Sequence, residues 1–210
     1  MAVDLCSSIL DSRKTYNKQN PILFDDKSII KLEDILSMKI EFIENIKIPT
    51  IVAIIGDFDS FSIACTLKLL SMGNIVVPLT EDTESQHDYF LRESQATFLI
   101  KNKTLLKVEK SEQILNPHSQ QLLKFKKGGI VFFSTGTTGK PKAILHSLEN
   151  FLKPYRERKK PHRSIGFLVF DHIGGFNTLF HLLFNSGTIY RTKTRGIDEI
   201  LGLIKKHNLT

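Results

Sequence analysis

The residues with the clearest chemical potential form one short segment in the middle of the chain. Residues 134–142 read Ser-Thr-Gly-Thr-Thr-Gly-Lys-Pro-Lys, which gathers four hydroxyls, two glycines and two lysines. Glycines let backbone amides approach a ligand closely, and successive exposed amides form a concave anion site. Hydroxyl and ammonium groups add hydrogen bonds, worth about 1.5–3 kcal/mol each where charge is involved. A phosphate chain is the ligand that suits this segment best.

The segment is not the P-loop of nucleoside triphosphatases. That motif reads Gly-x-x-x-x-Gly-Lys-[Ser/Thr], and here Ser134 replaces its first glycine while Pro141 replaces its Mg²⁺-binding hydroxyl. Pro141 also pushes Lys140 toward an extended conformation. We therefore expect the loop to lead into an extended segment at 143–145 and not into a helix. The alternative is an ordinary Ser/Thr/Gly turn, in which so many donors beside two lysines would be rare.

A second candidate group is the segment Asp-His-Ile-Gly-Gly at 171–175. We expect a strand at 165–170 to end just before His172, and ligands of open α/β sheets bind at the carboxyl ends of the strands. A single histidine more often has a structural role than a functional one. His172 is nevertheless a candidate, because of this position and the glycines that follow it. His181 lies in a stretch rich in Leu and Phe, where we expect core packing. Neither His nor Cys spacing indicates a transition-metal site.

The elements that must position these groups alternate between strand and helix patterns. Short apolar runs typical of buried strands occupy 50–55, 75–77, 96–100, 130–133, 165–170 and 188–190. Helical patterns occupy 32–46, 58–72, 84–95, 176–184 and 197–207. A small hairpin is expected at 22–30, Gly73 stands where a helix C-cap glycine belongs, and 102–127 shows no clear pattern. The alternation predicts an α/β fold with mostly parallel sheets and flanking helices.

Composition excludes several classes of protein. The chain has 210 residues, of which 41% are hydrophobic and 24% charged, so it can bury a core without disulfides. Cys6 and Cys65 alone cannot form a disulfide framework or a four-ligand zinc site. The N-terminus lacks the pattern of a secretory signal, and no apolar run approaches the roughly 18 residues of a membrane span. We therefore expect a cytoplasmic protein without a membrane span.

The net charge of +7 is unevenly distributed along the chain. Residues 101–163 hold 15 Lys and Arg against 4 Asp and Glu, and the densest run lies at 153–163. Such a run can bind a polyanion, but only Tyr155 and His162 interleave rings with it, which is few for a platform that stacks single-stranded bases. We expect a solvated surface here and no nucleic-acid partner, with part of the charge serving a nucleoside triphosphate.

The segment at 134–142 resembles the signature loop of the AMP-forming adenylating enzymes, which include acyl-CoA synthetases, luciferases and the adenylation domains of peptide synthetases. The family pattern is [Ser/Thr]-[Ser/Thr]-Gly-Thr-Thr-Gly-x-Pro-Lys-Gly, and this chain matches it through Lys142, with Ala143 in place of the last glycine. Residues 52–79 resemble an early segment of the family, 170–175 its Phe-His-x-x-Gly segment, and 188–210 the strand and helix beyond. The resemblance covers the chain from about Ile22 onward.

The resemblance implies a reaction in two steps. A carboxylate attacks the α-phosphorus of Mg²⁺-bound ATP, pyrophosphate leaves, and an acyl-adenylate forms. A thiol of coenzyme A or of a carrier protein's phosphopantetheine then takes the acyl group, as in the activation steps of fatty acid metabolism. Charge that develops on the leaving pyrophosphate must be neutralised by positioned donors and a metal ion. The implied partners are thus a carboxylic acid, ATP with Mg²⁺, and a thiol acceptor.

The resemblance also implies roles for individual residues. ATP would be bound by Ser134, Thr135, Gly136, Thr137, Thr138, Gly139, Lys140 and Lys142. Lys142 would contact the phosphates, His172 would lie beside the acyl pocket and the adenylate, and both would take part in catalysis. Gly174 and Gly175 would let the following helix approach that pocket.

Three later motifs of the family do not occur in the sequence: an aromatic-Gly-x-Thr-Glu segment, a ribose-binding Thr-Gly-Asp and a lysine on a mobile C-terminal domain. We therefore expect residues 1–210 to form a partial AMP-binding domain, the N-terminal portion of the large domain of an adenylate-forming enzyme. The missing C-terminal subdomains could belong to a second chain. The alternative hypothesis is a non-catalytic module, derived from such an enzyme, that binds a nucleotide or a partner.

Overall fold

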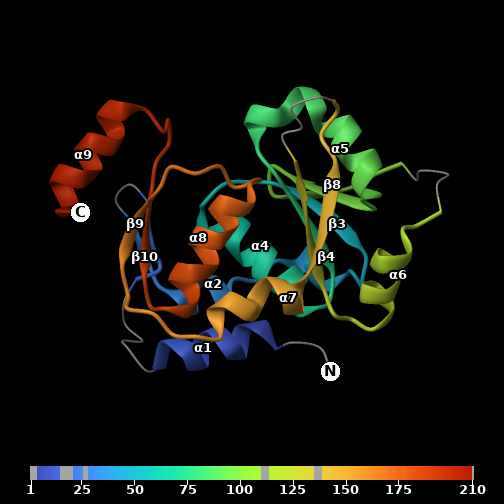
Figure 1. The fold of residues 1–210 in the computed structure, drawn as a ribbon, viewed down its shortest axis with the longest axis horizontal. Coiled ribbons are helices and arrows are strands. Elements are labelled where there is room, and N and C mark those ends of the chain that lie inside the picture. Colours follow the sequence, from blue (N-terminus) through green and yellow to red (C-terminus); the bar gives the residue numbers. More distant parts are fainter. Residues whose placement is uncertain (1–3, 15–20, 26–27, 110–113, 135–138, 210) are drawn as a thin grey trace.

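The computed structural model describes residues 4–14, 21–25, 28–109, 114–134 and 139–209. It contains two β-sheets, with helices between and around them (Figure 1). Among the described residues, five of the eight strand pairings are parallel, and the antiparallel ones lie at sheet edges. The predicted α/β fold with mostly parallel sheets and flanking helices is therefore confirmed.

The larger sheet has six strands in the order β6-β5-β3-β4-β7-β8. Its four inner strands run parallel, whereas β6 pairs with β5 and β8 pairs with β7 in antiparallel fashion. Strands β3 and β4 are buried on both faces, which explains their unbroken apolar sequences. The strands are β3 (Ile51–Ile55), β4 (Ile75–Leu79), β5 (Phe98–Lys101), β6 (Thr104–Lys107), β7 (Gly129–Phe133) and β8 (Ala143–Ser147).

The smaller sheet has four strands in the order β2-β1-β10-β9. The hairpin expected at 22–30 is confirmed as the antiparallel pair β1–β2, and β1 then pairs in parallel with β10. β9 also pairs in parallel with β10, on its other side. The strands are β1 (Leu23–Asp25), β2 (Ser28–Ile30), β9 (Arg163–Gly166) and β10 (Thr188–Arg191).

Helices α4 and α8 lie between the two sheets (Figure 1), and α1 contacts both of these helices. Phe176 of α8 meets Phe132 of β7 edge to face, with ring centroids 5.2 Å apart, so one buried cluster joins the larger sheet to this helix. Gly73 has φ +81° directly after Met72, the C-cap of α4, and is therefore the expected C′ glycine. The helices are α1 (Leu5–Lys14), α2 (Leu32–Ser37), α3 (Glu41–Glu44), α4 (Ser60–Ser71), α5 (His87–Ser94), α6 (Pro117–Lys124), α7 (Leu148–Leu152), α8 (Ile173–Phe184) and α9 (Ile197–His207), with 3₁₀ turns η1 (Glu81–Gln86) and η2 (Lys153–Tyr155).

Three predicted elements need correction. The helix expected at 32–46 is two short helices, because Ile40 between them has the non-helical angles φ −133° and ψ 82° and is buried there. The helix expected at 84–95 begins as the 3₁₀ turn η1 and is α-helical only from His87, with Thr83 non-helical inside the turn. The strand expected at 165–170 is β9, which ends at Gly166 because its register with β10 ends there.

Candidate functional site

The segment 134–142 connects the antiparallel strands β7 and β8 at one edge of the larger sheet. Its two ends are closed by a pair of hydrogen bonds: the Ser134 amide donates to the Lys142 carbonyl at 3.0 Å, and the Lys142 amide donates to Ser134 Oγ at 3.1 Å. The extended segment expected at 143–145 is confirmed as β8. Thr135, Gly136, Thr137 and Thr138 lie outside the described residues.

The two lysines of this loop have different surroundings. Lys140 Nζ lies over the ring of Tyr89, 5.7 Å from its centroid. The Lys142 ammonium is exposed and makes no hydrogen bond or ion pair with any residue that the structure describes. Gly139 has open space around it, since a Cβ added there would meet no atom of the described residues within 4 Å. Packing therefore does not require a glycine at this position, which leaves the backbone of Gly139 accessible to a ligand.

His172 is the N-cap residue of α8. Its Nδ1 accepts a hydrogen bond from the Gly174 amide at 3.2 Å, and its side chain is exposed. A neutral imidazole that accepts at Nδ1 carries its proton on Nε2, so His172 can donate one further hydrogen bond from Nε2. The sequence predicted that His172 lies directly after the end of a strand. In the structure it does not, because β9 ends at Gly166.

Gly174 and Gly175 differ in what their surroundings demand. A side chain on Gly175 would place its Cβ 2.2 Å from the Val169 carbonyl oxygen, so α8 can approach the preceding loop only because this residue is glycine. At Gly174 the nearest atoms would be His172 Nδ1 at 3.4 Å and Leu168 Cδ1 at 3.6 Å, which are ordinary contacts. The close approach of the helix is therefore observed at Gly175 and is made to the protein's own backbone.

The two candidate segments lie at the carboxyl ends of two neighbouring parallel strands of the larger sheet. Thr80 follows β4 directly, and Ser134 follows the neighbouring parallel strand β7. Thr80 Oγ1 donates to Asp171 Oδ2 at 2.8 Å, which ties the residue before His172 to the carboxyl end of β4. The carboxyl ends of the strands are where parallel α/β sheets bind ligands, so the residues of both segments are candidates for one binding site.

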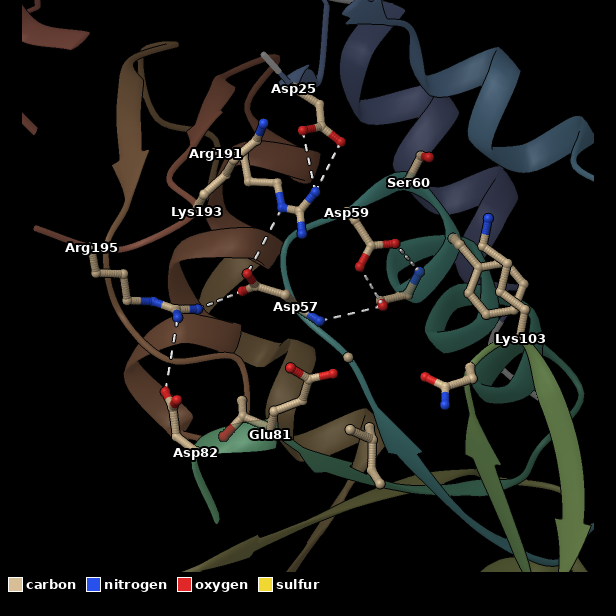
Figure 2. A pocket seen from close by; sticks show the side chains of 16 residues that line it. Asp25, Asp57, Asp59, Ser60, Glu81, Asp82, Lys103, Arg191, Lys193 and Arg195 are labelled. Carbon is tan, nitrogen blue, oxygen red and sulfur yellow. Dashed lines mark hydrogen bonds and ion pairs between the residues drawn. The ribbon is translucent and has the colours of Figure 1, made fainter. Parts of the chain in front are cut away.

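A cleft of about 530 Å³ lies at the carboxyl ends of β1, β3, β4 and β10, between the two sheets (Figure 2). Asp57, which follows β3 and Gly56, receives a hydrogen bond from Arg195 Nη2 at 2.6 Å and lies 3.8 Å from Arg191 Nε. Arg191 also donates to Asp25 at 3.1 Å. Burial raises the pKa of the Asp57 carboxyl, and the two guanidinium groups offset only part of this effect.

Two features of the site were missed by sequence reasoning. The ion pair of Asp57 with Arg195 joins residues that are 138 positions apart in the chain, so no local pattern indicates it. The only available signal was an acidic residue immediately after a strand and a glycine. Tyr89 was missed for the same reason: it contacts the loop from α5, 52 residues away.

Two further properties concern only the described part of the chain. No group of three or more His, Cys, Asp or Glu side chains there could hold a metal ion. Among the helices described, none is both long and apolar enough to span a bilayer.

No protein-family model matches the sequence, and no curated protein matches it. Many solved structures share its fold. The N-terminal subdomain of Klebsiella oxytoca NpsA superposes with a TM-score of 0.75 at 15% identity, over 100% of this chain and 61% of that one. O-succinylbenzoate coenzyme A synthetase from Bacillus subtilis, in complex with AMP, has a TM-score of 0.71 at 14% identity, over 97% of this chain and 60% of that one.

A luciferase-like enzyme from the mealworm Zophobas morio is a third match, with a TM-score of 0.67 at 15% identity over 99% of this chain and 58% of that one. The NpsA subdomain has also been solved with acyl-AMSN compounds such as 3-hydroxyanthranilyl-AMSN. The chain thus has the fold of the N-terminal portion of adenylate-forming enzymes, as predicted. It spans about three fifths of the length of these matched chains.

Proposed function

We propose that this chain is the N-terminal portion of an AMP-forming acid–thiol ligase, and that residues 134–142 bind the phosphates of ATP. One observation supports the proposal most. The loop carries the signature sequence of the adenylate-forming enzymes in a chain that has their fold, and hydrogen bonds join its two ends at the edge of the larger sheet. The Lys142 ammonium is left unpaired among the described residues. Residues 1–210 would then form a partial AMP-binding domain.

The described residues of the loop fit a triphosphate. Because Ser134 Oγ accepts from the Lys142 amide, its O–H remains available as a donor. Lys142 would neutralise charge on the β- and γ-phosphates, and Gly139 would let the backbone approach them. Mg²⁺ would be bound through ATP, which when bound supplies the adenylyl group. With Thr135, Gly136, Thr137, Thr138 and Lys140, these residues make up the proposed ATP site.

His172 is proposed to act at the acyl end of the site. Its Nε2–H donor could hold an oxygen of the carboxylate or of the adenylate, while Nδ1 stays engaged with the Gly174 amide. Gly175 sets how closely α8 can approach, and Gly174 supplies the amide that fixes the imidazole. Together they orient a donor at the carboxyl end of the sheet.

The remaining partners also belong to the proposal. These are a carboxylic acid substrate, coenzyme A or a phosphopantetheine thiol as acceptor, and the further subdomains of the enzyme, on this or a second chain. A cytoplasmic location is part of the same proposal. The competing hypothesis is a non-catalytic module that binds a nucleotide or a partner with the same loop.

Exchange of labelled pyrophosphate into ATP, measured with a panel of carboxylic acids, tests the proposal. Activity of this chain, alone or with an added second chain, is the expected result. Lys142→Ala should slow exchange by about 10²–10³, the effect of losing one preorganised donor, whereas Lys153→Ala, an exposed lysine after α7, should change it little. Absence of exchange in both settings, with ATP binding intact, would favour the non-catalytic module.

A further inference from the structure

Both arms of the phosphate loop are held by the same helix, α5. On the incoming arm, Phe133 precedes Ser134 and stacks on Phe90, with ring centroids 4.0 Å apart and planes 22° apart. On the outgoing arm, the Tyr89 hydroxyl donates to the Pro141 carbonyl at 2.8 Å. Two consecutive residues of one helix therefore contact the two ends of a loop that is distant in the sequence.

The helix that makes these contacts is itself fixed to the sheet. His87, the first residue of α5, is buried, and its Nε2 lies 2.9 Å from the carbonyl oxygen of Thr80. Thr80 follows β4 and donates to Asp171 beside His172. Helix α5 thus links the edge that carries the phosphate loop to the segment that carries the imidazole.

Tyr89 also determines how the two lysines of the loop differ. The ring of Tyr89 lies under the ammonium of Lys140, at 5.7 Å from centroid to Nζ, which is within the range of a cation–π contact. Lys142, two residues on, has no such contact among the described residues. A single side chain therefore holds one lysine aside and fixes the carbonyl between the two, while the ammonium of Lys142 makes no hydrogen bond, ion pair or ring contact with the described residues.

We propose that Tyr89 is a positioning residue of the phosphate loop, through its hydroxyl on Pro141 and its ring under Lys140. Lys142 is then the lysine that reaches the phosphates, and Lys140 contributes a fixed positive charge beside them. This inference rests on the proposed function, because it assumes that the loop binds ATP. Its physical reason is preorganisation: donors that are held in place before binding lose less entropy when the ligand arrives.

The test uses the whole chain and measures the Kd of Mg²⁺·ATP by calorimetry. Tyr89→Phe keeps the ring but removes one hydrogen bond, so the Kd should rise by roughly 2- to 10-fold, the range of one such bond. Tyr89→Leu also removes the cation–π contact with Lys140, together with that of Arg92 on the same ring at 5.9 Å, and should raise the Kd by about a further 2- to 5-fold. In the Tyr89→Leu background, Lys140→Ala should change the Kd by a different factor than it does in the wild type, because the effects of substitutions at contacting residues are not additive.

Two variants control for loss of stability alone. Tyr155→Phe removes a hydroxyl that donates to Asn177 Oδ1 at 2.8 Å, and Phe125→Leu removes an exposed ring that faces Lys124 at 5.8 Å. Both should leave the Kd of Mg²⁺·ATP within about two-fold of wild type, even where urea unfolding shows a loss of stability similar to that of Tyr89→Phe.

The outcomes separate the inference from the proposed function. If the wild type does not bind Mg²⁺·ATP, the proposed function falls and the inference falls with it. If the wild type binds and Tyr89→Phe binds equally well, only the inference is overturned. An equal loss in Tyr89→Phe and Tyr155→Phe would also overturn it, because the effect would then reflect general stability.

Discussion

Replacing Gly175 by alanine should destabilise the protein far more than the same change at Gly174, one residue earlier in α8. The added Cβ at position 175 would lie 2.2 Å from the backbone oxygen of Val169 and 3.1 Å from the ring of Phe58, which is buried. A backbone oxygen cannot rotate away as a side chain can. The first turn of α8 or the loop before it would therefore have to move by about 1 Å to restore an ordinary contact.

The expected magnitude follows from two opposing effects. Gly→Ala inside a helix normally stabilises by roughly 0.5–1 kcal/mol, because alanine loses less backbone entropy. At Gly174 the added methyl meets only ordinary contacts, so this gain should be largely retained. At Gly175 the overlap should cost about 1–3 kcal/mol, as overpacked core substitutions do. The entropy gain applies at both helix positions and cancels in the comparison, so the two variants should differ by the overlap cost alone, about 1–3 kcal/mol in the free energy of unfolding.

Urea unfolding followed by circular dichroism measures this difference, with equal denaturant slopes as the check that both variants unfold in the same way. Thermal unfolding should also show a lower Tm for Gly175→Ala, by about 2–4 °C for each kcal/mol lost in a chain of this size. Equal stability of the two variants would refute the argument that close packing against Val169 requires glycine at position 175.

Two other predictions concern titratable groups that lie away from the proposed site. Burial raises the pKa of the Cys65 thiol to about 12, so at pH 8 only about one thiol in ten thousand is ionised. Iodoacetamide should therefore leave Cys65 unmodified until the protein unfolds. Modification of Cys65 in the native protein at the rate of the unfolded chain would contradict this prediction. Burial, with His162 and Lys159 nearby, lowers the pKa of His181, so the folded state binds that proton less readily than the unfolded chain. The free energy of unfolding should be at its full value above the ordinary pKa of about 6.5 and should fall as the pH decreases through and below it. In urea unfolding between about pH 7.5 and 5.5, His181→Leu should make the dependence of this free energy on pH shallower. An unchanged dependence would exclude His181 as its source.

Local sequence predicted those parts of the fold whose signals are local. The buried strands β3, β4 and β7 have continuous apolar runs, and the turn before β8 has a proline that prevents a helix. Helix α6 was missed although Asn116 caps it and Pro117 begins it, which are recognised start signals. Strand β6 was missed because the turn before it uses Asn102 and Lys103 with positive φ, and this pair lacks the glycine that marks such turns.

The candidate site was predictable only as a list of residues. The loop sequence indicated phosphate binding, and the structure brings Ser134 and Lys142 together as the ends of one closed loop. Contacts across the fold were beyond local patterns: Tyr89 with Pro141, and Asp57 with Arg195, are set by how the sheets and helices pack. Such contacts depend on tertiary structure, because no periodicity or turn signal relates residues so far apart.

The central claim is that the loop at 134–142 holds the phosphates of ATP through Lys142. An ATP analogue with a transferable acyl group on its γ-phosphate labels lysines that lie beside the phosphates, and peptide mass spectrometry identifies which lysines are modified. We predict acylation of Lys142, and strong protection of it by excess Mg²⁺·ATP. Labelling that falls instead on Lys159 and Lys160 of the exposed basic run, or labelling of Lys142 that excess ATP does not reduce, would contradict the claim.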